Sequence, residues 1–92
     1  MKKMISADKK VELNVDKWLM LKNGWEYYLE EGKGDVVFGL VLGASDELGY
    51  VSLEEVAPYV AYKVEGAELN NPNFVPAPAV GYFWKEEAEN VN

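Results

Sequence analysis

The chain has 92 residues, a hydrophobic content of 49% and a formal net charge of −7, so it is long enough for one folded domain and too apolar for a disordered acidic segment. It contains no Cys, no His and no Arg, which excludes disulfides, thiolate metal sites, cysteine nucleophiles and histidine proton transfer, and argues against an enzyme. The acidic balance argues against direct nucleic-acid binding, which needs a basic surface.

Residues 1–10 contain four lysines, and no apolar segment follows them. We therefore expect no signal peptide, no membrane span and a cytoplasmic location, and we predict a loose lead-in for this stretch. Val11, Leu13 and Val15 then alternate with polar residues, which is the period-2 pattern of a half-buried strand.

The Asn23-Gly24 pair lies between two runs rich in aromatic and aliphatic residues, 18–22 and 25–30. This arrangement is a strong signal for a β-hairpin closed by a two-residue turn. Such a turn pairs Lys22 with Trp25 and so fixes the register of both strands. The side chains that this register places on the expected core face are Trp18, Met20, Trp25, Tyr27 and Leu29.

A glycine-rich turn at residues 31–35 precedes the run VVFGLVL, residues 36–42, which is apolar on both faces. The run predicts a central strand that is covered on both sides. Gly39 and Gly43 mark places where something packs close to the backbone. We expect an aromatic ring from a neighbouring strand there, and a ligand or partner backbone is the alternative.

Residues 44–49 predict a third turn, followed by a short strand that begins at Tyr50. The sequence Ser-Leu-Glu-Glu at 52–55 has the pattern of a capping box, so we predict a short helix over about residues 53–57 that ends before Pro58. Residues 59–65 alternate between apolar and polar side chains and predict an edge strand.

The C-terminal part changes character after Gly66, with turn residues at 70–73 and prolines that favour an extended segment. Twelve aromatic residues in a chain of this size exceed what its core can hide, so we expect some of them at a partner surface. The alternative is that the tail, residues 70–92, folds back over its own sheet. The residues that we predict to contact a partner are Phe74, Tyr82, Phe83 and Trp84.

Three acidic groups are the only candidates for chemistry: 30–31 with Asp35, 46–47, and 54–55. None of them has the alternating oxygen ligands of a calcium loop. Turn positions and the first turn of a helix favour acidic residues for structural reasons. We therefore expect no catalytic residue, no metal site and no cofactor.

Three sequence blocks carry a resemblance to a known family. They are W-x-Y-Y-x-E at 25–30, F-G-L-V-x-G at 38–43 and E-L-G-Y-V-S-L-x-E-V at 47–56. In order and spacing they resemble a small domain of unknown function whose members are frequent on plasmids, conjugative elements and phages. The resemblance covers about residues 17–57, and Val51 stands where the family usually has Phe. It implies a mobile-element context but no activity, cofactor or catalytic residue.

Taken together, these patterns predict a single α+β domain spanning residues 1–92. We expect an antiparallel meander of four to five strands, one short helix near 53–57 and an extended C-terminal segment. For function we expect a non-enzymatic protein-binding module whose partner is another protein or a second copy, without direct nucleic-acid or membrane binding. One alternative is an acidic nucleic-acid mimic that inhibits a host defence protein, of the anti-restriction or anti-CRISPR type. A less favoured one is a small carboxylate-dependent hydrolase.

Overall fold

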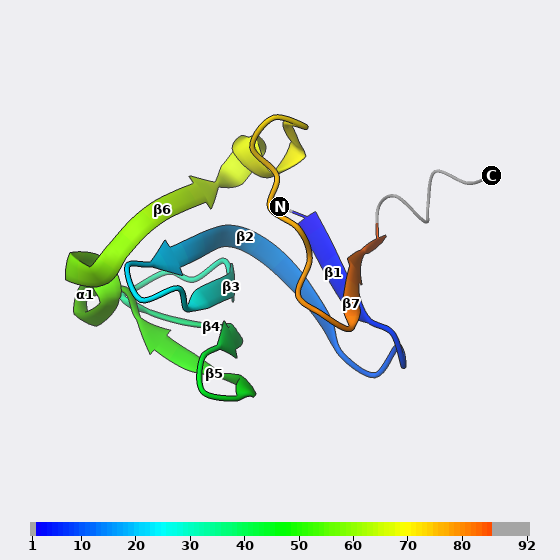
Figure 1. Ribbon diagram of the computed structural model, residues 1–92, viewed down its shortest axis with the longest axis horizontal. Helices are drawn as coiled ribbons and strands as arrows, with labels where there is room; N and C mark the ends of the chain where they lie inside the picture. Colours follow the sequence, from blue (N-terminus) through cyan, green and yellow to red (C-terminus); the bar gives the residue numbers. More distant parts are fainter. Residues whose placement is uncertain (1, 86–92) are drawn as a thin grey trace.

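The computed structural model describes residues 2–85, in which seven antiparallel strands form one curved sheet with a short α-helix (Figure 1). The strands are β1 (Lys2–Ser6), β2 (Glu12–Leu21), β3 (Glu26–Glu30), β4 (Val36–Leu42), β5 (Asp46–Ser52), β6 (Val60–Glu65) and β7 (Tyr82–Trp84). The helical elements are α1 (Leu53–Val56) and the 3₁₀ turns η1 (Ala57–Tyr59) and η2 (Gly66–Asn70). The α+β class and the short helix are confirmed, whereas four to five strands was too few.

Strand β2 organises the sheet because one of its edges is shared by two strands. Its first half pairs with β1, its second half pairs with β6, and β3 lies along its other edge. The register with β3 shifts between Val15 and Lys17, which is the signature of a β-bulge. The bulge lets Leu13, Val15 and Trp18 join the same hydrophobic cluster, although strict alternation would put Trp18 on the opposite face.

Both faces of the sheet bury apolar side chains. The first cluster consists of Met4, Leu13, Val15, Trp18, Tyr28, Leu40, Leu69, Ala79 and Trp84. The second cluster consists of Leu19, Leu21, Tyr27, Leu29, Val37 and Val51. Because neighbouring residues of a strand alternate between faces, the two clusters lie on opposite sides of β2, β3 and β4. The C-terminal segment covers the first cluster, and α1 with η1 covers the second (Figure 1).

The predicted β2–β3 hairpin is present, but its register is one residue away from the predicted one. Met20 pairs with Glu26, and Leu21 N donates a hydrogen bond to Trp25 O. The loop therefore has three residues, 22–24, and ends at Gly24 with a φ of 92°. The two-residue turn was the wrong choice, because Asn-Gly also suits a three-residue loop that needs a positive φ at its last position.

The shifted register changes which side chains share a face. Trp18 pairs with Tyr28 over the first cluster, whereas Leu19 pairs with Tyr27 over the second. The expected single core face is wrong, since both faces of this hairpin are covered.

Two further predictions about local structure are wrong. The expected loose lead-in forms β1, because Met4 and Ile5 are buried where this strand lies between β2 and β7. The turn expected over 44–49 is shorter, since β5 already begins at Asp46 and pairs with β4 along its whole length. The edge strand expected over 59–65 is present as β6.

Candidate functional site

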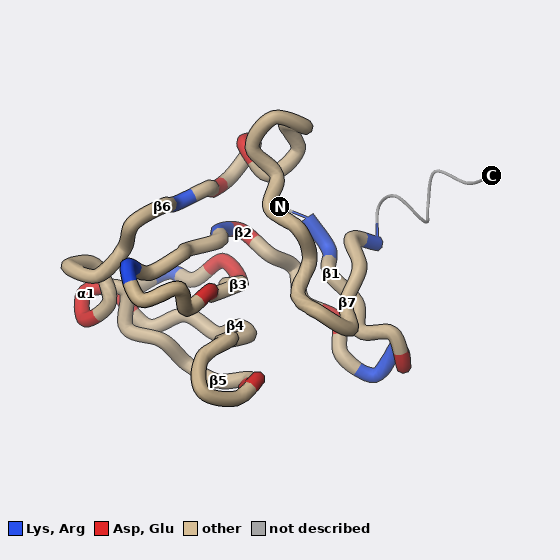
Figure 2. The backbone as a smooth tube through the Cα atoms, in the orientation of Figure 1, with Lys and Arg blue, Asp and Glu red and all other residues tan. Residues whose placement is uncertain are grey.

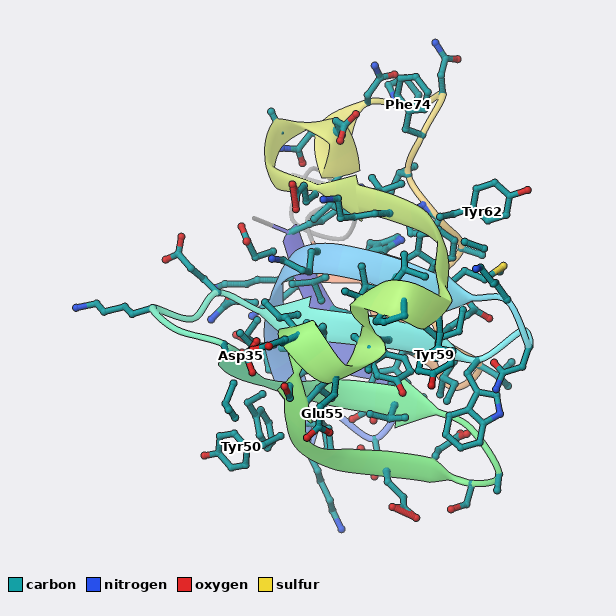
Figure 3. The ribbon with its side chains drawn as sticks, turned by 90° about the vertical axis from the view of Figure 1, so that its left-hand side faces the viewer. Asp35, Tyr50, Glu55, Tyr59, Tyr62 and Phe74 are labelled. Atoms are coloured by element: carbon teal, nitrogen blue, oxygen red, sulfur yellow. The ribbon has the colours of Figure 1, made fainter. Side chains whose placement is uncertain are left out.

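The four residues predicted to contact a partner do not form one surface. Trp84 is only 4% exposed, and its Nε1 donates a hydrogen bond of 3.0 Å to Pro76 O. Tyr82 and Phe83 are half-buried in β7. Phe74 is 54% exposed and lies beside η2, far from α1 (Figure 3). Up to Lys85, the described end of the chain, the tail packs in cis, and of these four side chains Phe74 alone is exposed.

Tyr28 holds this tail against the sheet. Its hydroxyl lies 2.8 Å from Ala77 O and 3.2 Å from Glu26 Oε1, so two acceptors share one proton. Trp18 Nε1 also donates to Glu26 Oε1, at 3.1 Å. Burial, followed by the charge of Glu26, raises the pKa of Tyr28 well above its usual value. Tyr28 therefore remains a neutral donor at physiological pH.

Helix α1 is fixed in place by Asp35, from the turn between β3 and β4. Asp35 Oδ1 accepts a hydrogen bond of 2.7 Å from Glu54 N, and Asp35 O accepts one of 2.9 Å from Leu53 N. Ser52 Oγ donates to Asp35 Oδ2 and accepts from Glu55 N at 3.3 Å, which is the serine half of the predicted capping box. Sequence reasoning missed the role of Asp35, because it lies 17 residues from Ser52 and no local pattern links them.

Helix α1 and η1 cover the second cluster incompletely and leave a hollow on each side. The hairpin–helix hollow has a volume of about 410 Å³ and is lined by Leu21, Lys22, Asn23, Trp25, Tyr27, Glu55, Val56 and Tyr59. The helix–β6 hollow has a volume of about 400 Å³ and is lined by Lys17, Leu19, Leu53, Val56, Ala57, Val60, Lys63 and Glu65. Val56 lines both hollows and so separates them.

The hairpin–helix hollow has an apolar floor and aromatic walls. Leu21 and Tyr27 are each 7% exposed and form the floor, whereas Trp25 is 38% and Tyr59 61% exposed at the walls. Figure 3 shows Tyr59 on the same side of the molecule as Glu55, which contributes to the rim. Apolar floors with Trp and Tyr walls are typical of the centres of protein–protein interfaces.

The helix–β6 hollow is more polar, and its charges are already paired. Glu65 lies between two ammonium groups, 3.9 Å from Lys17 Nζ and 3.6 Å from Lys63 Nζ. Surface ion pairs of this kind contribute little to stability, but they occupy the polar groups that would contact a partner. The hairpin–helix hollow is therefore the better candidate site.

The predicted acidic groups do not converge on a metal site. Glu54 and Glu55 occupy the first turn of α1, and Asp46 and Glu47 begin β5. Among residues 2–85, no three acidic side chains come together in a way that could hold a metal ion. No helix within this described part of the chain has both the length and the apolar character needed to cross a membrane.

The charges are distributed unevenly over the molecule (Figure 2). Residues 30–59 contain seven acidic residues and one lysine, a net charge of −6 out of −7 for the whole chain. The opposite end of the sheet carries the four lysines of residues 2–10, in β1 and the turn that follows it (Figure 2). The half formed by β4, β5 and α1 is therefore the acidic half.

No protein-family model matches this chain, and no curated protein and no solved structure matches it either. The fold and the candidate site define it as a small acidic α+β protein with an aromatic hollow beside a short helix.

Proposed function

We propose that this protein is a non-enzymatic binding module that acts by occupying the surface of another protein. The observation that carries the proposal is the hairpin–helix hollow, in which exposed Trp25 and Tyr59 flank a buried apolar floor. Trp and Tyr supply a large contact area with few rotatable bonds, and they dominate the energetic centres of interfaces.

The hollow is also held in shape before any partner arrives. Trp25 packs against Gly43, where an added Cβ would lie 2.7 Å from the indole ring. Asp35 caps the helix that contributes Glu55 and Val56 to the opposite wall. A surface fixed in this way loses little conformational entropy when it binds, which favours affinity.

The family resemblance supports the same site. The strand block at 25–30 supplies Trp25 and Tyr27, and the block at 47–56 supplies Glu55 and Val56, so two of the three blocks meet at this hollow. A mobile-element context favours an accessory protein that acts on host components, and the partner that we propose is a bacterial host protein.

The test is affinity capture from a bacterial host lysate with the immobilised protein. The double variant Trp25→Ala/Tyr59→Ala is compared with Phe74→Ala, which removes an exposed ring outside the hollow. We expect a captured protein that Phe74→Ala retains and the double variant loses, with both variants folded by circular dichroism. Equal capture by all three proteins, or no capture above the bare resin, would refute the proposal.

The uneven charge supports a second candidate, an acidic mimic of nucleic acid that inhibits a host defence protein. The net charge of −6 within residues 30–59 is the observation in its favour. Competition between this protein and double-stranded DNA for the captured partner tests it. If DNA does not displace the protein, and Glu54→Lys/Glu55→Lys binds as well as the parent, this candidate is excluded.

A further inference from the structure

Strand β5 is the terminal strand of the sheet, and among residues 2–85 it pairs with β4 alone (Figure 1). Its seven residues pair without a register shift, from Val36 opposite Ser52 to Leu42 opposite Asp46. The outer edge of such a strand presents unpaired backbone N–H and C=O groups, which are a template for another strand. The other outer strands fit this role less well, because β7 has only three residues and β6 has an irregular register.

An exposed apolar strip runs beside this free edge. Tyr50 is 76%, Leu48 45% and Val36 57% exposed. Tyr50 contacts Phe38 of β4 edge-on, with ring centroids 5.2 Å apart. Residues 48 and 50 share one face because alternate residues of a strand point the same way. A strand added next to β5 would place every second side chain beside Leu48 and Tyr50.

The opposite face of the same strand is open at its centre. It carries Glu47, Gly49 and Val51, and an added Cβ on Gly49 would have no neighbouring atom within 4 Å. Long side chains from an added strand have room to reach across this gap toward the Glu47 carboxylate. The edge can therefore accommodate a segment that alternates apolar and long polar residues.

The negative charge around the outer edge of β5 determines which kind of segment can pair with it. Residues 35–59 contain five acidic residues and no lysine, and four of the five lie at the two ends of β5, at 46–47 and 54–55. A second copy of this chain would bring the same negative charge against the edge, so self-pairing is disfavoured. A segment rich in Lys or Arg would gain favourable electrostatics instead.

We infer that β5 binds an extended basic segment of a partner protein, which adds to the sheet as a further strand. Backbone hydrogen bonds supply the affinity of such strand addition, and side chains at alternate positions supply the specificity. The inference concerns a different surface from the hairpin–helix hollow and does not depend on Trp25 or Tyr59.

The probe is a ten-residue peptide that alternates lysine and valine, titrated into the 15N-labelled protein at low salt. We expect the largest amide shifts in β5 and a dissociation constant that rises steeply as salt is added. A peptide of the same sequence with alternate amides N-methylated keeps its charge but cannot pair along a strand edge. It should bind at least about tenfold more weakly, because strand addition depends on main-chain hydrogen bonds.

Variants separate the edge from other surfaces. The double variant Glu47→Lys/Glu54→Lys should bind the peptide at least about tenfold more weakly, because it removes the charge complementarity. Glu68→Lys changes an exposed acid in η2 away from this edge and should reduce the affinity far less. The Trp25→Ala/Tyr59→Ala variant should bind the peptide normally, so failure of the proposed function would not be mistaken for failure here.

Three results would overturn the inference. Equal affinity for the N-methylated peptide would show a contact through charge alone. Shifts centred on the hairpin–helix hollow would place the peptide elsewhere. A dimeric mass by light scattering that becomes monomeric in Tyr50→Lys would assign the edge to a second copy of this chain.

Discussion

The six-membered ring of the Trp25 indole lies directly against Gly43. A Cβ built on Gly43 would fall 2.7 Å from both Cε3 and Cζ3 of Trp25, a distance that real Cβ atoms essentially never reach. Only glycine at this position lets the ring lie on the backbone that follows β4. The contact fixes one wall of the hairpin–helix hollow, so a scaffold position determines the shape of the candidate site.

Gly43→Ala is therefore expected to displace Trp25 and to lower the free energy of unfolding by about 1–3 kcal/mol, as overpacking usually does. Urea unfolding measures this loss. Trp25 is the most exposed of the three tryptophans, at 38% against 9% and 4%, so its fluorescence is the most accessible to acrylamide. Displacement of its ring from Gly43 should increase this quenching further. Gly34→Ala is the matched control, since an added Cβ there has no neighbour within 4 Å. Equal stability of the two variants would contradict this account.

Gly39 and Gly49 face each other across β4 and β5 but should respond to alanine in opposite ways. A Cβ on Gly39 would clash with two atoms of the β3 backbone, Tyr28 O and Leu29 Cα, which cannot turn aside. Gly39→Ala should cost about 3 kcal/mol or more, or prevent folding. Gly49→Ala has open space and should stabilise by about 0.5–1 kcal/mol, because glycine loses more entropy in a strand. Thermal unfolding should show Gly39→Ala melting below the parent and Gly49→Ala melting above it. The reverse ranking of the two melting temperatures would contradict this prediction.

The hairpin shows how far the sequence determines this fold. Asn23-Gly24 predicts the two strands and the position of the turn between them, but not the length of the loop. A two-residue and a three-residue loop both use a glycine with positive φ here, so the dipeptide does not distinguish them. The register depends instead on Tyr27 and Tyr28, which are buried on opposite faces. No alternation is visible when both faces are covered, so the local pattern cannot choose between two registers.

The candidate site is even less predictable from local patterns. Trp25 and Tyr27 are recognisable as an aromatic strand, but Tyr59 reaches the same hollow only because η1 follows α1 across the second cluster. The contact between Trp84 and Pro76 likewise depends on how the tail crosses the sheet. Such placements depend on tertiary packing, which spacing along the chain does not encode.

Removal of the Asp35 carboxylate should loosen α1. Asp35→Ala deletes the acceptor for Glu54 N, and a helix of four residues has little stability of its own. The expected loss is about 0.5–2 kcal/mol in the free energy of unfolding, the usual cost of a lost N-terminal cap. Glu31→Ala removes an equal charge from the same turn and should be nearly neutral. A loss of equal size in both variants would assign the effect to net charge rather than capping.

Stability should fall in acid through Asp8 and Glu12. The Ser6 hydroxyl, followed by the Lys10 N–H, lowers the pKa of Asp8 below its ordinary 3.8. Lys85, with a smaller contribution from Lys3, lowers the pKa of Glu12 below 4.5. Because both pKa values are lower in the folded state, the two carboxylates stabilise the folded protein above about pH 4.5. This stabilisation is lost as the pH falls through the pKa values of the folded state.

Urea unfolding between pH 7 and pH 2.5 measures this acid dependence. The double variant Asp8→Asn/Glu12→Gln should show a shallower decline than the parent, because its folded and unfolded states bind protons more equally. Glu31→Gln removes one exposed carboxylate elsewhere in the chain and controls for the change in net charge. If the free energy of unfolding of the double variant falls with pH as steeply as that of the parent, these two carboxylates are not the cause of the loss of stability in acid.

Tyr28 provides the last prediction, because it joins the tail to the sheet through one hydroxyl. Tyr28→Phe keeps the buried ring but removes the donor 2.8 Å from Ala77 O, so we expect a loss of about 0.5–1.5 kcal/mol. Hydrogen exchange should quicken in residues 75–81 more than in β4, since the bond fixes the tail locally.

Tyr28 should also make stability depend on pH in the alkaline range. Because the pKa of Tyr28 is raised in the folded state, the stabilisation that this side chain gives is full below pH 10 and is lost at higher pH. Tyr28→Phe should abolish this loss of stability at high pH. Tyr59→Phe, at an exposed ring, should change neither the free energy of unfolding nor the hydrogen exchange of residues 75–81. Equal effects of both variants on these two measurements would contradict the role assigned to Tyr28.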